Sequence, residues 1–156
     1  MRDEPTNERS SLIARYLPDV PLRSRKKLAA ISRYERPARG TYLMREGRPT
    51  MDLGLIVDGR LAVTDRIGRD DITLMTLDAG DVFGWSVVLD GVSTASIVAE
   101  ANAGVVLFDG AALRAALDTD KGLALVIYRR LLEAAASRLD ATRMLARDVY
   151  AFRGSA

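Results

Sequence analysis

The chain has 156 residues, 48% of them hydrophobic and 28% charged, which is ordinary for one soluble globular domain. It contains no cysteine and no histidine. A disulfide, a thiolate metal site and a cysteine nucleophile are therefore excluded, and the commonest metal ligand and general base are missing. We predict no catalytic residue and no metal site, and a binding module is favoured over an enzyme.

Positive charge is concentrated in the N-terminal third. The formal net charge is +2, yet residues 1–50 contain twelve Lys or Arg against six Asp or Glu. The basic run Arg23–Lys27 is a candidate surface for nucleic acid or an acidic partner. It lacks interleaved aromatic side chains, and no groove-reading element follows it. A solvated helix face is the favoured interpretation, and the sequence assigns the run no role.

No segment is predicted to enter or cross a membrane. The longest apolar runs fall well short of the roughly 18 residues that a membrane span needs. The N-terminus is charged and lacks the apolar core of a signal peptide. We therefore expect a cytoplasmic protein.

Two short helices are predicted first in chain order. Residues 1–9 are polar, and we expect them to form a flexible N-terminus. A short helix capped by Ser10 or Ser11 follows, and Pro18 ends it. Pro21 suits the first turn of a second helix, because its fixed φ matches the helix and its missing N–H is not needed there.

Between residues 34 and 108 the pattern changes to short apolar segments separated by turns that contain glycine. The pair Asp58–Gly59 indicates a hairpin, since both residue types accept the positive φ angles of a tight turn. Segments that recur about every 8–12 residues predict an antiparallel sandwich or barrel. The six predicted strands cover residues 42–44, 53–57, 61–64, 72–77, 95–99 and 104–108.

Two further helices are predicted after the strands. A short one over about 111–117 follows the capping residue Asp109. A longer one runs from Asp118 or Asp120 to about Tyr150, and some thirty helical residues would extend about 45 Å. A seam of that length needs a partner, either the strands or a second copy of the chain. We predict a homodimer through the apolar positions Leu125, Tyr128, Leu132, Ala135 and Leu139.

Three motifs carry a resemblance to a known family: Gly40–Gly47, Leu55–Val63 and Leu77–Gly84. With the order helices, strands, short helix and long helix, they make the chain resemble the cyclic nucleotide-binding domain. This is the sensory module of the catabolite activator family, of kinase regulatory subunits and of gated channels. The resemblance covers about residues 10–150 and implies a mainly β (α+β) fold. That fold is a double-stranded β-helix, a jelly-roll-like β-roll over about 34–108, with N-terminal helices, C-terminal helices over about 110–150 and a tail at 151–156.

The family's phosphate-binding cassette falls on a segment that lacks two charges. In relatives that bind a ligand, the residue after the cassette glycine is usually a glutamate for the ribose, and here it is Trp85. The arginine that pairs with the cyclic phosphate is replaced by Ser93. Trp85 either stacks on a purine or, as we favour, fills the pocket. The candidate residues of this degenerate ligand site are Gly84, Trp85, Ser86, Ser93, Thr94, Ala95 and Ser96.

Several functions follow from the resemblance. We expect no cofactor and disfavour high-affinity binding of cyclic AMP or cyclic GMP. The first expectation is a stand-alone regulatory module that acts through dimerisation and protein partners or through another small ligand. The alternative is a transcription-associated regulator of the catabolite activator type that binds cyclic nucleotide or nucleic acid weakly. Such relatives carry a helix-turn-helix domain after the long helix, and the sequence ends at Ala156, so direct DNA binding is disfavoured. An enzyme of the double-stranded β-helix type would need histidines around a metal, and the chain has none.

Overall fold

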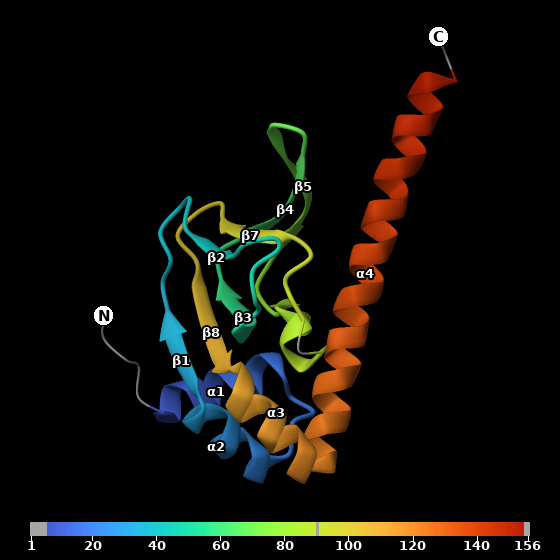
Figure 1. The fold of residues 1–156 in the computed structure, drawn as a ribbon. Helices are drawn as coiled ribbons and strands as arrows, with labels where there is room; N and C mark the ends of the chain where they lie inside the picture. The colour runs from blue at the N-terminus through green and yellow to red at the C-terminus, as the bar shows by residue number, and fades with distance from the viewer. Residues whose placement is uncertain (1–5, 90, 155–156) are drawn as a thin grey trace.

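A computed structural model describes residues 6–89 and 91–154 of the chain. Helices α1 (Thr6–Tyr16) and α2 (Leu22–Ala30) precede the strands, and α3 (Gly110–Thr119) and α4 (Lys121–Arg153) follow them. Figure 1 shows α1, α2 and α3 gathered at one end of the strands, while α4 runs along one side. This arrangement confirms the predicted β-roll with flanking helices and a long C-terminal helix.

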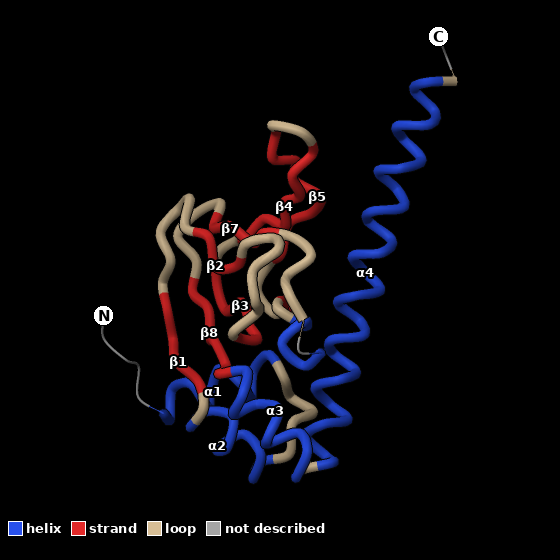
Figure 2. The backbone as a smooth tube through the Cα atoms, in the orientation of Figure 1, coloured by secondary structure: helices blue, strands red, loops and turns tan. Residues whose placement is uncertain are grey.

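The strands of the described residues form two four-stranded antiparallel sheets (Figure 2). One sheet has the order β1-β8-β3-β6, and the other has the order β2-β7-β4-β5. A short 3-10 helix, Trp85–Leu89, lies between β6 and β7. The strands are β1 (Ser32–Glu35), β2 (Tyr42–Met44), β3 (Asp52–Asp58), β4 (Leu61–Ile67), β5 (Asp70–Leu77), β6 (Val82–Phe83), β7 (Ser96–Ala99) and β8 (Gly104–Asp109).

The first sheet is buried on both faces, which explains why β3 and β8 are almost continuously apolar. Side chains alternate between the two faces of a strand. In β3, Leu53 and Leu55 therefore join the core formed with the helices, and Ile56 joins the core between the sheets. The strand β8 alternates in the same way, with Phe108 toward the helices and Leu107 toward the other sheet. The roll and the helices thus share one central sheet.

The hairpin predicted at Asp58–Gly59 is confirmed. Gly59 joins β3 to β4 with φ +75°, a conformation that L side chains rarely adopt. A Cβ at this position would also lie 2.5 Å from the Asn102 carbonyl oxygen. Glycine is therefore needed here both for the turn and for the close approach of the neighbouring loop.

Some boundaries differ from the sequence prediction. The segment 1–9 was expected to be flexible, but α1 begins at Thr6 and includes Arg9, while residues 1–5 lie outside the described residues. The reason is that Arg9 is buried and its Nε donates to the Ala29 carbonyl at 3.3 Å, which fixes this turn against α2. At the other end, α4 continues to Arg153, so the expected tail at 151–156 is partly helical. Strands β1 and β6 were not predicted.

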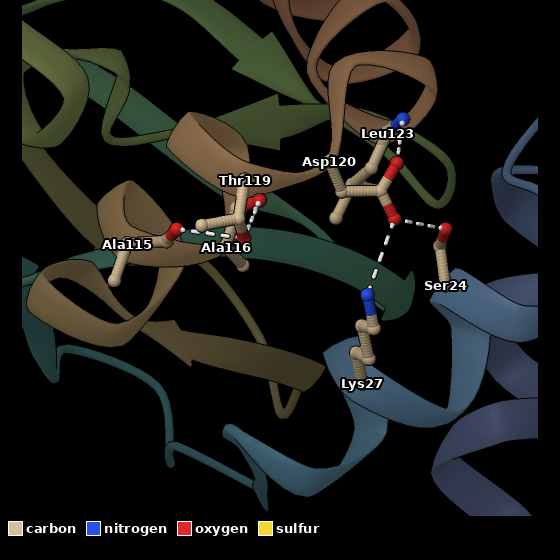
Figure 3. A network of polar contacts seen from close by, with 7 residues as sticks. All are labelled: Ser24, Lys27, Ala115, Ala116, Thr119, Asp120 and Leu123. Carbon is tan, nitrogen blue, oxygen red and sulfur yellow. Dashed lines mark hydrogen bonds and ion pairs between the residues drawn. The ribbon is translucent and has the colours of Figure 1, made fainter.

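A buried carboxylate joins the start of α4 to α2 (Figure 3). Asp120 caps α4 by accepting a hydrogen bond from the Leu123 backbone N–H at 3.0 Å. Its other oxygen accepts from Ser24 Oγ at 2.7 Å and lies 3.6 Å from Lys27 Nζ. The Ser24 bond, followed by the backbone bond from Leu123, lowers the pKa of Asp120, and burial opposes this shift. The start of the long helix is therefore fixed by charge-assisted contacts.

The long helix has two unlike halves. Leu123, Ile127 and Leu131 are buried against the rest of the protein, but no described residue after Leu131 is buried. Figure 1 shows the C-terminal half extending beyond the β-roll. Among the described residues, no helix combines the length and the apolar character that crossing a membrane requires.

Candidate functional site

The turn of the predicted cassette is present at the end of β6. Gly84 has φ +86°, and a Cβ there would collide with the Asp52 carbonyl oxygen, so only glycine fits. The 3-10 turn that follows is closed by a hydrogen bond from the Val87 N–H to the Gly84 carbonyl at 3.1 Å. The Gly91 N–H then donates to the Ser86 carbonyl at 3.1 Å. The backbone of the segment is therefore held by its own hydrogen bonds.

Two of the predicted hydroxyl ligands are engaged within the protein. Ser93 is buried, and its Oγ donates to the Ala95 carbonyl at 2.6 Å. Ser96 Oγ accepts from the Glu46 N–H at 3.0 Å. Ala95 lies in the core between the sheets, while Thr94 is exposed and Ser86 is buried. Of the predicted residues, Gly84, Trp85, Ser86, Ser93 and Thr94 line one small pocket. Ala95 and Ser96 do not line it.

That pocket is too small for a nucleotide. Its volume is about 10 Å³, and it is lined by Met44, Gly84, Trp85, Ser86, Ser93, Thr94, Ile97 and Arg138. A cavity needs roughly 10–15 Å³ to hold one water molecule. The pocket that most of the cassette residues line is therefore about the size of one water molecule.

Trp85 and a residue from α4 close this pocket. Trp85 is half-buried and packs against the core shared by the first sheet and the helices. The Arg138 guanidinium carbon lies 4.7 Å from the centroid of the Trp85 ring, a cation–π contact. Burial lowers the pKa of Arg138, and the negative charge of Asp65 opposes this shift. An arginine is therefore present at the cassette, but it comes from the long helix.

Arg138 was not predicted as a site residue because charged positions of a long helix usually face solvent. A signal was present in the spacing. Ile127, Leu131 and Ala134 contact the core at steps of four and three residues, and Arg138 follows at the next step of four. Residues at these steps share one face of a helix. The face of α4 that packs on the roll therefore ends in a cation.

A larger cavity of about 150 Å³ lies between α4 and the roll, beside Trp85. The roll contributes Val63, Met75, Leu77, Gly80, Asp81, Val82, Phe83 and Ile97, and α4 contributes Arg130, Glu133, Ala134, Ser137 and Arg138. Arg130 is committed to structure, since its Nη2 donates to the Gly80 carbonyl at 2.9 Å and its Nη1 to Glu133 at 3.4 Å. The Arg138 side chain makes no hydrogen bond or ion pair with any residue that the structure describes.

A second groove, of about 360 Å³, lies along β1, β2 and the loop that leads to β3. Arg33, a half-buried arginine of this groove, is already paired, because it donates to both oxygens of Asp52 at 2.9 and 2.7 Å. This pairing raises the pKa of Arg33. No group of three or more His, Cys, Asp or Glu able to hold a metal ion occurs in residues 6–89 and 91–154.

Known structures share this fold. A cyclic nucleotide-binding domain from Methylobacillus flagellatus superposes with a TM-score of 0.78 at 22% identity, over 91% of this chain and 85% of that one. The sensor domain of the transcriptional regulator DNR from Pseudomonas aeruginosa gives 0.69 at 18% identity, over 86% and 93% of the two chains. Identities this low show the fold alone.

A third similar structure carries changed residues. It is the regulatory subunit of a cAMP-independent protein kinase A from Trypanosoma brucei, with a TM-score of 0.63 and 18% identity over 80% of this chain and 47% of that one. This form has one glutamate and one valine replaced by alanine and one threonine replaced by arginine, and it is described as bound to cAMP in the A site.

Sequence comparison identifies the family. No curated protein matches the sequence significantly. The profile of the cyclic nucleotide-binding domain matches residues 35–120, which is more than half of the chain. That range contains strands β2 to β8 and the last residue of β1, together with the cassette and α3. The chain therefore belongs to the cyclic nucleotide-binding domain family.

Proposed function

We propose that this domain is a regulatory sensor module that does not bind cyclic AMP or cyclic GMP with high affinity. The observation that carries the proposal is the cassette pocket of about 10 Å³, closed by Trp85 and Arg138. Ligand-binding relatives usually carry a glutamate and an arginine at two cassette positions. This chain has Trp85 and Ser93 there. The hydroxyl of Ser93 is also used by the Ala95 carbonyl.

The expected loss of affinity is large. A charge-assisted hydrogen bond contributes about 1.5–3 kcal/mol net. Losing the contacts to ribose and phosphate together would cost about 3–6 kcal/mol. This corresponds to about two to four decades in the dissociation constant. A micromolar site would become a millimolar one.

Isothermal titration with cyclic AMP and cyclic GMP tests this proposal. We expect no micromolar binding by the unaltered chain, and micromolar binding of either nucleotide would contradict the proposal. The double variant Trp85→Glu/Ser93→Arg removes the ring and restores both charges, and we expect it to bind at least tenfold more tightly. The Trypanosoma brucei mutant, in which one arginine and two alanines were introduced and which is described as bound to cAMP, supports the arginine part of this design. A matched control, Leu89→Glu/Val92→Arg, adds the same charges at two exposed positions of the same segment.

We further propose that the module acts as a homodimer through α4. Leu125, Leu132 and Leu139 recur at seven-residue intervals, and their exposed fractions are 72%, 70% and 51%. Tyr128 and Ala135 recur at the same interval, four residues before the next leucine. This is the a and d pattern of a two-helix seam. The positions lie on the side of α4 away from the buried residues Ile127 and Leu131.

The runner-up function is a transcription-associated regulator, favoured by the likeness to the sensor domain from Pseudomonas aeruginosa. The basic run gives it limited support. Arg25 donates to the carbonyls of Val20 and Pro18 at 3.0 Å each, and Lys27 lies near Asp120, which leaves Arg23 and Lys26 exposed. A gel shift on duplex DNA distinguishes the two functions, because phosphate-driven binding falls steeply with salt. We expect no shift at low salt, and a salt-sensitive shift would favour the alternative.

A further inference from the structure

We propose that Arg138 holds a small organic carboxylate with a compact apolar body in the cavity between α4 and the β-roll. The proposal rests on the function proposed above, in which the cassette no longer anchors a cyclic nucleotide. The anion would be bound by the long helix and not by the cassette. The ligand class follows from the free charge, the walls and the size of the cavity.

Arg138 is the cation available to a ligand in this cavity. Its guanidinium covers the Trp85 ring and lines both the cassette pocket and the larger cavity. It makes no hydrogen bond or ion pair with any described residue, so its donors are open to a ligand. The neighbouring cation, Arg130, is bound to the Gly80 carbonyl and to Glu133. Asp65 acts on this guanidinium only through its charge. A half-buried guanidinium to which no carboxylate is hydrogen-bonded is costly to desolvate, and a bound anion would reduce that cost.

The walls favour an apolar body. Val63, Leu77, Val82, Phe83 and Ile97 are all buried side chains that line the cavity, and Met75 is half-buried beside them. Apart from Asp81, the charged and hydroxyl side chains lie on the α4 side. A ligand would thus place its hydrocarbon part on the roll and its charged part on the helix. Hydrophobic walls with few convergent polar groups are typical of small-molecule sites.

The volume restricts the body to about one ring or a short branched chain. The cavity measures about 150 Å³. An engineered apolar cavity of about this volume holds one benzene molecule. Drug-sized ligands occupy sites of about 300–1,000 Å³. A complete nucleotide exceeds the space, while an aromatic or branched aliphatic acid fits it.

The charges favour a carboxylate over a phosphate dianion. One free guanidinium matches the two oxygens of one carboxylate through parallel hydrogen bonds. A dianion would need a second cation, and Arg130 is already engaged. Asp81 and Glu133 also line the cavity, and their negative charges would repel a dianion more strongly than a monoanion.

The sole tryptophan of the sequence makes the test direct, because Trp85 lies beside Arg138 and lines the cavity. Benzoate and isovalerate are titrated into the full chain while Trp85 fluorescence is recorded, with benzamide as the neutral analogue of benzoate. We expect a saturable change with at least one of the two acids. Benzamide should bind at least tenfold more weakly than benzoate, since it cannot accept a charge-assisted pair of bonds.

Variants separate the role of Arg138 from general effects of charge. We expect Arg138→Gln to weaken binding tenfold or more and Arg138→Lys to weaken it less. Arg129→Gln removes an exposed arginine from the same helix and should leave the affinity unchanged. Thermal unfolding of each variant checks that the fold is retained. No neutral analogue of isovalerate is titrated. Its affinity for the unaltered chain is instead compared with its affinity for Arg138→Gln.

Two outcomes would overturn the inference: no saturable change with either acid, or equal affinity in the unaltered chain and in Arg138→Gln. Both would leave the proposed function intact. Micromolar binding of cyclic AMP or cyclic GMP by the unaltered chain would instead contradict the proposed function. The two failures are therefore distinguishable in one set of titrations.

Discussion

The two halves of α4 differ in what covers them. In the first half, Leu123, Ile127 and Leu131 are almost completely buried, and Asp120 fixes the helix to α2. In the second half, Leu139, Val149 and Tyr150 remain 51–75% exposed. Both halves are helical without interruption. Most helical stability in proteins comes from packing of one face, so the second half needs a source of stability that the first half already has.

The boundary between the halves is where the candidate site lies. Ala134 and Arg138 line the cavity from the face of α4 that contacts the roll, and Leu139 belongs to the exposed apolar positions of the same helix. We propose that one helix serves the folding of the domain on one face and association through its exposed apolar positions. We therefore expect substitutions in the first half to change the free energy of unfolding and substitutions in the second half to change association.

The largest effect is expected from charges in the seam. Leu132→Glu with Leu139→Glu places like charges at the predicted dimer interface, and we expect monomers by light scattering. The control Met144→Glu/Arg147→Glu alters two exposed positions of the same helix that are not part of the seam, and should leave a dimer. A dimer of unchanged mass in the seam variant would place the interface elsewhere.

The next effect concerns the buried half. Ile127 is 2% exposed, and Ile127→Ala should lower the free energy of unfolding by about 2–4 kcal/mol because it leaves a cavity in the core. Met144→Ala, at a position that is 64% exposed, should change it by less than about 0.5 kcal/mol. Urea denaturation of both variants measures the difference. Similar losses would mean that the two halves are equally packed.

A smaller, pH-dependent effect is expected at the start of α4. Asp120→Asn keeps the shape of the side chain but removes its charge, and should lower the thermal midpoint by several degrees near neutral pH. The folded protein lowers the pKa of Asp120, so its contribution is present above the unfolded pKa of about 3.9 and is lost as the pH falls through the folded pKa. The difference in midpoint between the two proteins should therefore shrink below about pH 4. A difference that is as large at pH 2–3 as at neutral pH would contradict this assignment.

The smallest effect compares two adjacent arginines. Arg130→Met leaves the Gly80 carbonyl without its donor and should cost about 1–2 kcal/mol in the free energy of unfolding. Arg129, with a side chain 77% exposed, reaches only Glu133 at 3.5 Å. Arg129→Met should cost less than about 0.5 kcal/mol. Equal losses would show that the contact between α4 and Gly80 contributes little.

Most of the fold could be predicted because local rules and global packing agree. The pair Asp58–Gly59 predicts its hairpin from turn chemistry alone, and Asp109 and Asp120 both occupy helix caps. Strand β1 was missed because Ser32–Glu35 has mostly polar side chains, and its place is set by pairing with β8. The two residues of β6 are too few to produce an alternating pattern. Long-range pairing decides both cases.

The candidate site was less predictable. The glycine and the short turn at Gly84–Leu89 follow from the sequence, as does the replacement of the expected charges by Trp85 and Ser93. The contribution of Arg138 depends on the rotation of α4 against the roll, which is set by the packing of Ile127 and Leu131. A residue 53 positions away in the chain cannot be assigned to the cassette by local patterns.

Because the start of α4 is anchored, a tilt of the helix would move its far end most. Its 33 residues span about 50 Å at 1.5 Å per residue, and Asp120 holds one end of that length. A tilt of about 10° around this end would move the far end by roughly 9 Å, while Arg138 would move about half as far. Small changes at the cavity would therefore be amplified toward Arg153, where the chain could transmit them to whatever it contacts.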